Sequence, residues 1–230
     1  MKLLAISKAG LTSVNREIYS TLYKKYGYQI TLVIPRYLII GNKRIDSDPF
    51  DDLPYEVIAL TMLGSDRFSR YKGIFGVLKY SEPDIIYFED DPITILAILL
   101  GIWCKQNNKK FVCRTNQNRP LTIISEGSRL GFVKGLFSVT IKLFLLQISK
   151  RLMDHLFTIS NDGMKVFTQL GLTNLTKIPL GFNEEIFKIN NKERKICRSN
   201  LNLNGIVISY MGRIFEGKGV HILIEALNRI

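Results

Sequence analysis

Several residue types are scarce in this chain of 230 residues, and each scarcity argues against a class of protein. There are only three cysteines, two histidines and one tryptophan. Cys104, Cys113 and Cys197 lie far apart and form no C-x-x-C pair, so we expect neither a disulfide framework nor a zinc site, and a reducing compartment fits better. Internal repeats and low-complexity segments are lacking, and the 46% share of hydrophobic residues is typical of a globular protein.

Long uninterrupted apolar runs are also missing from the sequence. The apolar start at residues 1–6 is too short for a secretory signal, and we interpret it as a buried strand. The run at 92–104 falls short of the about 20 residues that a membrane span needs. The stretch 130–148 is longer, but Lys134 and Lys142 interrupt it. We therefore expect no transmembrane helix.

Acidic residues are few: 20 Asp and Glu stand against 32 Lys and Arg, for a net charge of +12. Such an excess favours an anionic partner, which could be nucleic acid, anionic lipid or the phosphate of a small ligand. Composition does not choose among the three. The sequence shows no basic–aromatic stacking surface and no nucleic-acid motif, so we expect no nucleic-acid partner.

What the sequence does contain is a regular alternation of strand-like and helix-like segments. Strands are expected at 2–6, 28–34, 55–60, 85–88, 109–113, 154–159 and 175–179, and helices at 12–26, 73–81, 92–107, 130–151 and 161–170. A short hairpin is expected to turn at Gly41-Asn42. This alternation predicts an α/β fold with a doubly wound, parallel, Rossmann-like sheet.

The rhythm breaks after residue 180, which we take as a domain boundary. Residues 1–180 form the first domain, and the polar stretch 181–204 is predicted to be a linker with a short helix. A strand at 206–210, a glycine-rich loop and a helix from about Gly219 then open a second Rossmann-like domain at 205–230. Because one β-loop-α unit cannot bury its own core, we expect this domain to be incomplete.

The loop from Gly212 to Gly219 is the sharpest feature of the sequence. Its three glycines allow close approach of backbone N–H groups, the following helix N-terminus favours anions, and Arg213 and Lys218 add two cations. Together they suit a diphosphate. A Walker A loop also fits the spacing, but Gly219 replaces the hydroxyl residue that would hold Mg²⁺. A tight turn with two solvated cations is the third interpretation.

The surroundings of this loop resemble the GT-B glycosyltransferases, in particular the large retaining family 4. That family combines a strand ending in Ser, a helix with a Gly near its end, an I-P-x-G-x-[DN]-x-x-x-F stretch, a G-R-x-x-x-x-K-G loop and a helix reading L-I-E-A. The matching residues here are Ile159-Ser160, Gly171, Ile178 to Asn183, Phe187, Gly212-Arg213, Lys218-Gly219 and Leu223 to Ala226. The resemblance is close over 160–230 and looser over the first domain.

The resemblance implies a hexosyltransferase that uses a nucleotide-diphosphate sugar as donor, with retention and without a metal or other cofactor. Gly212, Arg213 and Lys218 would bind the donor diphosphate, whose developing charge preorganised cations stabilise in the transition state. The acceptor would be a glycan or a lipid-linked glycan in cell-envelope polysaccharide or glycolipid synthesis. We expect a cytoplasmic protein, peripheral on the inner face of the membrane.

In the first domain the resemblance assigns fewer residues. Gly10 is our candidate for the loop after the first strand, with a plain turn as the alternative. Asn116 stands where many relatives carry a His or an acid near the sugar, and together with Glu89 it is our catalytic candidate. For Asp90 and Asp91, sugar binding and helix capping both remain open. We interpret Asp46 and Asp48 as solvated turn residues, not as a metal site.

The sequence departs from the family at its C-terminal end, where a pair of glutamates that grips the donor would normally follow. We therefore expect a truncated or split glycosyltransferase that is inactive alone. The alternative is a non-catalytic binding or assembly subunit that needs a partner chain for donor binding.

Helix 130–151 is basic and rich in aromatic residues. Lys134, Ser138, Lys142, Ser149 and Lys150 fall within one arc of a helical wheel of about 100° per residue. A basic amphipathic helix with aromatic residues indicates docking to an anionic membrane surface, while a solvated lysine face on a helix that covers the sheet is the alternative.

Overall fold

The computed structural model describes all residues except 65, 123–130, 185–186, 213, 215 and 230. The chain divides into two compact units, Met1–Leu180 and Gly181–Ile230. Each unit is described below by itself.

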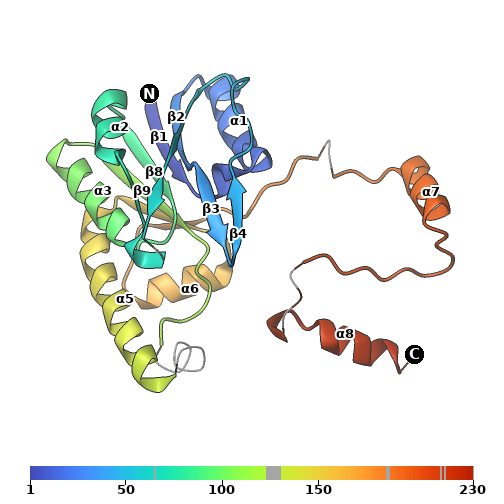
Figure 1. The fold of residues 1–230 in the computed structure, drawn as a ribbon. Coiled ribbons are helices and arrows are strands. Elements are labelled where there is room, and N and C mark those ends of the chain that lie inside the picture. Colours follow the sequence, from blue (N-terminus) through green and yellow to red (C-terminus); the bar gives the residue numbers. More distant parts are fainter. Residues whose placement is uncertain (65, 123–130, 185–186, 213, 215, 230) are drawn as a thin grey trace. The chain divides into compact units, whose positions relative to one another are not determined.

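The first unit is built on a seven-stranded parallel sheet with the order β11-β10-β9-β8-β1-β2-β5 (Figure 1). The strands are β1 (Lys2–Ser7), β2 (Gln29–Pro35), β5 (Glu56–Leu60), β8 (Ile85–Glu89), β9 (Lys110–Thr115), β10 (His155–Thr158) and β11 (Leu175–Lys177). Two antiparallel pairs lie outside this sheet: β3 (Tyr37–Ile40) with β4 (Lys43–Asp46), and β6 (Met62–Leu63) with β7 (Arg70–Tyr71). The parallel, doubly wound α/β fold predicted from the sequence is confirmed.

Helices cover both faces of this sheet. They are α1 (Glu17–Tyr26), α2 (Ile74–Ser81), α3 (Ile95–Gln106), α5 (Phe132–Leu152) and α6 (Asn161–Gln169), with short 3₁₀ turns at Ala9–Leu11, Ser13–Arg16 and Asp66–Phe68. Alternation along β1 separates two apolar clusters. Leu4 and Ile6 join the larger cluster with α2, α3, α5 and α6, whereas Leu3 and Ala5 join the smaller one with α1. Figure 1 shows α1 and α2 on opposite sides of β1.

Glycines and caps explain where several helices begin and end. Gly27 ends α1 with φ 65°, the left-handed conformation expected of a glycine after a helix. The N-terminal cap of α3 is Thr94, whose Oγ1 accepts a hydrogen bond from the Ala97 N–H at 3.1 Å. The expectation that Asp90 or Asp91 caps this helix is therefore wrong, because α3 starts beyond Pro92 and both carboxylates are engaged elsewhere.

Helix α5 turns a different face to the core from the one expected. Ser138, Lys142 and Ser149 are buried, so the expected solvated or docking face made of these residues is wrong. Ser138 Oγ accepts a hydrogen bond from Arg67 Nη2 at 2.9 Å, whereas the buried hydroxyl of Ser149 has no hydrogen-bond partner among the described residues. Phe132, Val133, Phe137 and Phe144 are exposed on the other side of the helix.

By length and composition alone, α5 is the one helix among the described residues that could cross a membrane. The core helix of a soluble protein meets the same criterion. Since α5 packs against α3 and buries Val139, Leu145 and Leu146 in the first unit, we interpret it as a helix of this domain.

The second unit contains α7 (Asn191–Asn200), a 3₁₀ turn at Glu216–Lys218 and α8 (Val220–Leu227). Asn190 caps α7, with its Oδ1 accepting hydrogen bonds from the N–H groups of Lys192 and Glu193. The strand predicted at 206–210 is wrong for this structure: those residues are extended but unpaired. A strand needs a neighbour for its ladder, and the described part of 181–230 contains no other strand.

Candidate functional site

The strand order places a topological switch point between β1 and β8. From β1 the chain proceeds outward to β2 and β5, and it returns to the other side of β1 with β8. Ligands of open α/β sheets bind beyond the carboxyl ends of the strands at such a point. Here these ends bring Ser7 of β1 beside Glu89 of β8, which are direct partners in the parallel register.

Glu89 is the centre of a buried polar cluster at this edge. Its Oε2 accepts hydrogen bonds from Ser7 Oγ and from Tyr19 OH, the latter at 3.2 Å, and its Oε1 accepts one from Arg114 Nη1. The Glu89 side chain is only 9% exposed and that of Arg114 16%. The three donors come from β1, α1 and β9, so Glu89 connects these three elements at the carboxyl edge of the sheet.

Two tyrosines next to this carboxylate are kept protonated. Burial, and then the nearby charge of Glu89, raise the pKa of Tyr19 well above its ordinary value. The same two causes, in the same order, raise the pKa of Tyr87. Both hydroxyls therefore remain neutral at physiological pH and act on Glu89 as dipoles, not as charges.

A second group of charges surrounds Asp90 and Asp91, directly after β8. Lys8 Nζ lies 2.5 Å from Asp90 Oδ2, and Thr115 Oγ1 donates to Asp91 Oδ1. Burial raises the pKa of Asp91, which the Thr115 hydrogen bond and the charges of Lys8 and Lys142 counteract.

Tyr71 of β7 adds a buried hydroxyl group to the surroundings of Asp90. Its side chain is buried, and its hydroxyl has no hydrogen-bond partner among the described residues. Burial, and then the charge of Asp90, raise the pKa of this hydroxyl. A water molecule or a ligand hydroxyl would satisfy it.

Arg16 holds the loop after β1 in place by hydrogen bonds, although no sequence pattern pointed to this residue. Arg16 is 1% exposed, and its guanidinium donates to the carbonyl oxygens of Gly10, Leu11, Asp48 and Pro49 at 2.6 to 2.9 Å. Burial lowers the pKa of Arg16, and Asp48 opposes this effect. An arginine that is buried and hydrogen-bonded to backbone carbonyl oxygens cannot be distinguished from other arginines by its sequence neighbours.

Asp48 is part of the same support and not a purely solvated turn residue, which corrects that expectation. Its carboxylate accepts a hydrogen bond from the Ser13 N–H at 2.6 Å, which lowers the pKa of Asp48. Asp46 is exposed, as expected, and pairs with Arg44 at 2.6 Å. No group of three or more His, Cys, Asp or Glu side chains in the described part of the chain is arranged to hold a metal ion.

Gly10 is buried in this loop, and its N–H donates to Ser7 Oγ at 2.9 Å. A Cβ at this position would lie 2.9 Å from Ile34 Cγ2, closer than carbon atoms can pack. A glycine is therefore needed at position 10 for the loop to pack closely against β2. Its N–H group already donates a hydrogen bond within the protein.

We expect Gly10→Ala to destabilise the protein by about 1–3 kcal/mol, because the buried Ile34 has to move. Gly76 in α2 is a matched control, since a Cβ there meets nothing within 4 Å and Gly76→Ala should be neutral or stabilising. Urea unfolding of both variants measures the difference. Equal midpoints would contradict the close packing inferred for Gly10.

The other residues singled out from the sequence lie at two places. Asn116 is exposed directly after β9, at the same edge of the sheet as Glu89. In the second unit, Gly212 has φ 152° and Lys218 is exposed in the 3₁₀ turn, while Gly219 caps α8 with φ 68°. Arg213 lies outside the described residues.

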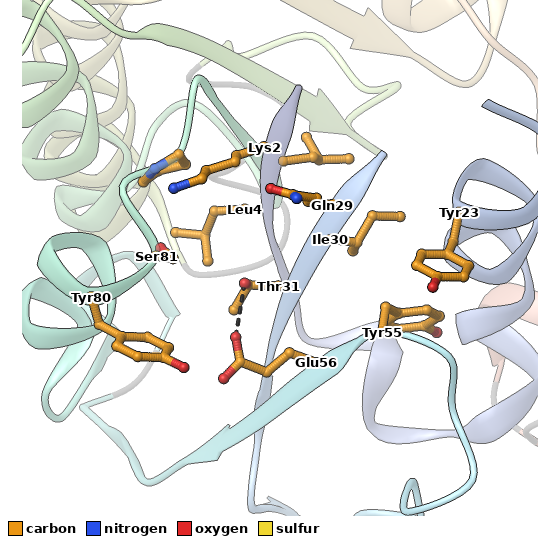
Figure 2. A pocket seen from close by; sticks show the side chains of 12 residues that line it. Lys2, Leu4, Tyr23, Gln29, Ile30, Thr31, Tyr55, Glu56, Tyr80 and Ser81 are labelled. Carbon is orange, nitrogen blue, oxygen red and sulfur yellow. Dashed lines mark hydrogen bonds between the residues drawn. The ribbon is translucent and has the colours of Figure 1, made fainter. Parts of the chain in front are cut away.

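A pocket of about 400 Å³ is found elsewhere in the first unit, where β1 and β2 begin (Figure 2). Lys2 and Gln29 are among the residues that line it, and Thr31 Oγ1 donates to Glu56 Oε2 at 3.0 Å there. Because this pocket includes the amino ends of the strands, away from the switch-point edge, we do not assign the candidate site to it.

Comparison with solved structures agrees with this fold. The whole chain aligns with Anabaena Alr3699/HepE, solved in complex with UDP, at a TM-score of 0.66 and 16% sequence identity; it spans 58% of that protein's length. Two further similarities are weaker. Phytolacca americana UGT2 aligns at a TM-score of 0.46 and 10% identity, over 86% of this chain and 57% of that one. A putative UDP-N-acetylglucosamine 2-epimerase from Listeria monocytogenes aligns at a TM-score of 0.44 and 11% identity, over 76% of this chain and 44% of that one. No protein-family model and no curated protein matches the chain. The similarity establishes the Rossmann-like architecture expected of a GT-B protein.

Proposed function

We propose that the chain is part of a retaining, family 4-like GT-B glycosyltransferase that takes a hexose from a nucleotide-diphosphate sugar. The observation that carries the proposal is the Gly212–Gly219 loop leading into α8, in a chain whose fold is that of a UDP-bound protein. Departure of the sugar leaves negative charge on the diphosphate. Lys218, Arg213 and the loop amides would stabilise that charge without a metal.

The first unit would provide the acceptor side of the reaction. Asn116 is an exposed hydrogen-bonding group at the carboxyl edge, suited to a sugar hydroxyl. Glu89 is saturated by three donors, so we assign it the role of positioning Arg114 and Ser7. The proposed acceptor is a glycan or a lipid-linked glycan, handled by a cytoplasmic protein that is peripheral on the membrane.

A specific observation favours the second candidate, a subunit that binds the donor only together with further polypeptide. Among the described residues of α7 and α8 none is buried, and Ile206, Val207 and Ile208 are all exposed. These apolar side chains are suited to packing against strands and helices beyond those that the described residues of this unit provide.

The test is thermal stability of the chain titrated with UDP-, GDP- and ADP-sugars. We expect one of them to raise Tm, and Lys218→Ala and Arg213→Ala to weaken its binding about tenfold or more, since each removes a charge-assisted contact. Lys192→Ala removes an exposed lysine of α7 in the same unit and should change nothing.

If none of the three sugars shifts Tm of the chain alone, donor binding by this chain is refuted and the second candidate is favoured. If a shift is seen but survives in both Lys218→Ala and Arg213→Ala, the glycine-rich loop is not the diphosphate site.

A further inference from the structure

A second and larger pocket lies at the amino edge of the sheet, where β1 and β2 begin. Its volume is about 970 Å³, close to the upper end of the range of roughly 300–1,000 Å³ that is typical of small-molecule sites. It shares Lys2 and Gln29 with the smaller pocket of Figure 2 and extends between α2 and the end of α3. We call it the α2–α3 pocket, and the lining residues that matter most are Lys2, Phe75, Lys79, Glu82, Trp103 and Lys109.

Two aromatic side chains give the α2–α3 pocket a surface for a flat ligand. Trp103 of α3 is the single tryptophan of the chain; it is partly buried and packs against the larger apolar cluster, which holds its ring in place. Phe75 of α2 is 46% exposed, and Leu78 of the same helix is buried. Because all three line the pocket, a planar aromatic ligand would bury apolar surface against rings that the fold already positions.

The charged residues of the pocket are three lysines, Lys2, Lys79 and Lys109, and two acids, Glu82 and Asp84. The Asp84 carboxylate is already engaged, because its Oδ2 accepts a hydrogen bond from the Lys2 N–H at 2.8 Å and its Oδ1 lies 3.7 Å from Lys109 Nζ. The Glu82 side chain is 75% exposed, and its carboxylate lies 4.0 Å from Lys2 Nζ. Such a long, solvent-screened pair contributes little.

The charge that is left for a ligand is therefore positive. Lys79 forms no ion pair within the part of the chain that the structure describes. The side chain of Lys109 is only 29% exposed, and its 3.7 Å distance to Asp84 is longer than a direct hydrogen bond, so its ammonium group can still donate to an anion. A cationic ligand would find only the exposed carboxylate of Glu82.

We propose that the α2–α3 pocket binds a small planar aromatic anion, of the chemical class of the aromatic carboxylates. The ring would pack against Trp103 and Phe75. The carboxylate would accept hydrogen bonds from Lys79 and Lys109. This inference goes beyond the proposed function and does not depend on it, because the pocket lies at the amino edge of the sheet and the switch point lies at the carboxyl edge.

The single tryptophan allows binding to be observed directly in this pocket. In a proton–nitrogen correlation spectrum the indole N–H of Trp103 gives one signal, and we expect naphthalene carboxylate to shift it with a Kd below about 1 mM. Naphthalene carboxamide keeps the rings without the charge, and cyclohexane carboxylate keeps the charge without an aromatic ring. Each should bind about tenfold more weakly, because one of the two recognition elements is lost.

Substitutions locate the two recognition elements. Lys79→Gln and Lys109→Gln should each weaken the binding of naphthalene carboxylate about tenfold, because each removes a charge-assisted contact. Lys105→Gln is the matched control, since Lys105 is exposed in α3 and does not line the pocket, and it should bind like the wild type. Phe75→Leu keeps an apolar side chain but removes the ring, and it should weaken binding about threefold or more.

The comparison of the three compounds uses the wild-type chain and so does not depend on the stability of any variant. The proposal is overturned if naphthalene carboxylate gives no saturable shift, if the carboxamide binds equally well, or if Lys79→Gln and Lys109→Gln both bind like Lys105→Gln. Failure of the proposed function is a different result. Binding of naphthalene carboxylate without a donor-induced Tm shift would support the α2–α3 pocket and refute donor binding by this chain, and the converse result would do the reverse.

Discussion

Arg16→Met is expected to destabilise the protein by about 3–5 kcal/mol, because several carbonyl groups lose their hydrogen-bond donor at about 1–3 kcal/mol for each buried one. Arg16 is almost fully buried, and its side chain makes four hydrogen bonds to backbone carbonyl oxygens. Methionine fills much of the volume but donates no hydrogen bond, so the buried carbonyl groups of Gly10 and Leu11 and the partly buried ones of Asp48 and Pro49 lose a partner. For a chain of this size we expect Tm to fall by roughly 10 °C.

Arg16→Lys should recover only a small part of that loss. An ammonium group has three donors in a compact arrangement, and it cannot reach carbonyls that the planar guanidinium holds on different sides. Arg44→Met is the control, because Arg44 is exposed and pairs with Asp46 on the surface. Chemical denaturation followed by circular dichroism gives the unfolding free energies. An Arg16→Met protein within 1 kcal/mol of the Arg44→Met control, a margin of about the size of a surface ion pair, would contradict the role given to Arg16.

The sheet could be predicted from the sequence because each of its strands carries a local pattern. The β-branched run before Pro35 predicts β2, and Gly27 marks the end of α1 in the left-handed conformation that the structure shows. These patterns depend on neighbours a few residues away. The same reasoning was wrong for 206–210, since a strand also needs a partner strand, which no local pattern can supply.

The candidate site was predicted only in outline. Polar residues at strand ends indicated the carboxyl edge, and Glu89 does lie there. Its saturation by Ser7, Tyr19 and Arg114 depends on side chains that lie 25 to 82 residues away in the chain. The orientation of α5 was missed for a similar reason: its buried lysine faces charges that only the folded sheet brings together.

The Glu89–Arg114 pair is expected to show the strongest coupling among the ion pairs in the described part of the first unit. Glu89→Leu leaves the mostly buried guanidinium of Arg114 without its carboxylate, and Arg114→Met leaves the carboxylate with hydroxyl donors only. Breaking one partner of such a pair costs about 3–5 kcal/mol, because the remaining charge stays in a poorly solvated place. Removing both partners avoids that penalty, although the hydroxyls of Ser7 and Tyr19 still lose their acceptor.

A double-mutant cycle separates these contributions. We expect the double variant to be no less stable than the worse single variant, which gives a coupling of several kcal/mol by the same range. The cycle of Arg44→Met and Asp46→Asn on the exposed β4 pair should give less than about 1 kcal/mol. Additive effects of the Glu89 and Arg114 substitutions would mean that the pair does not join β8 to β9. Coupling as strong as expected would show that Glu89 is committed to holding the edge of the sheet, and the sugar contacts that we propose for this edge would then be assigned to Asp90, Asp91 and Asn116.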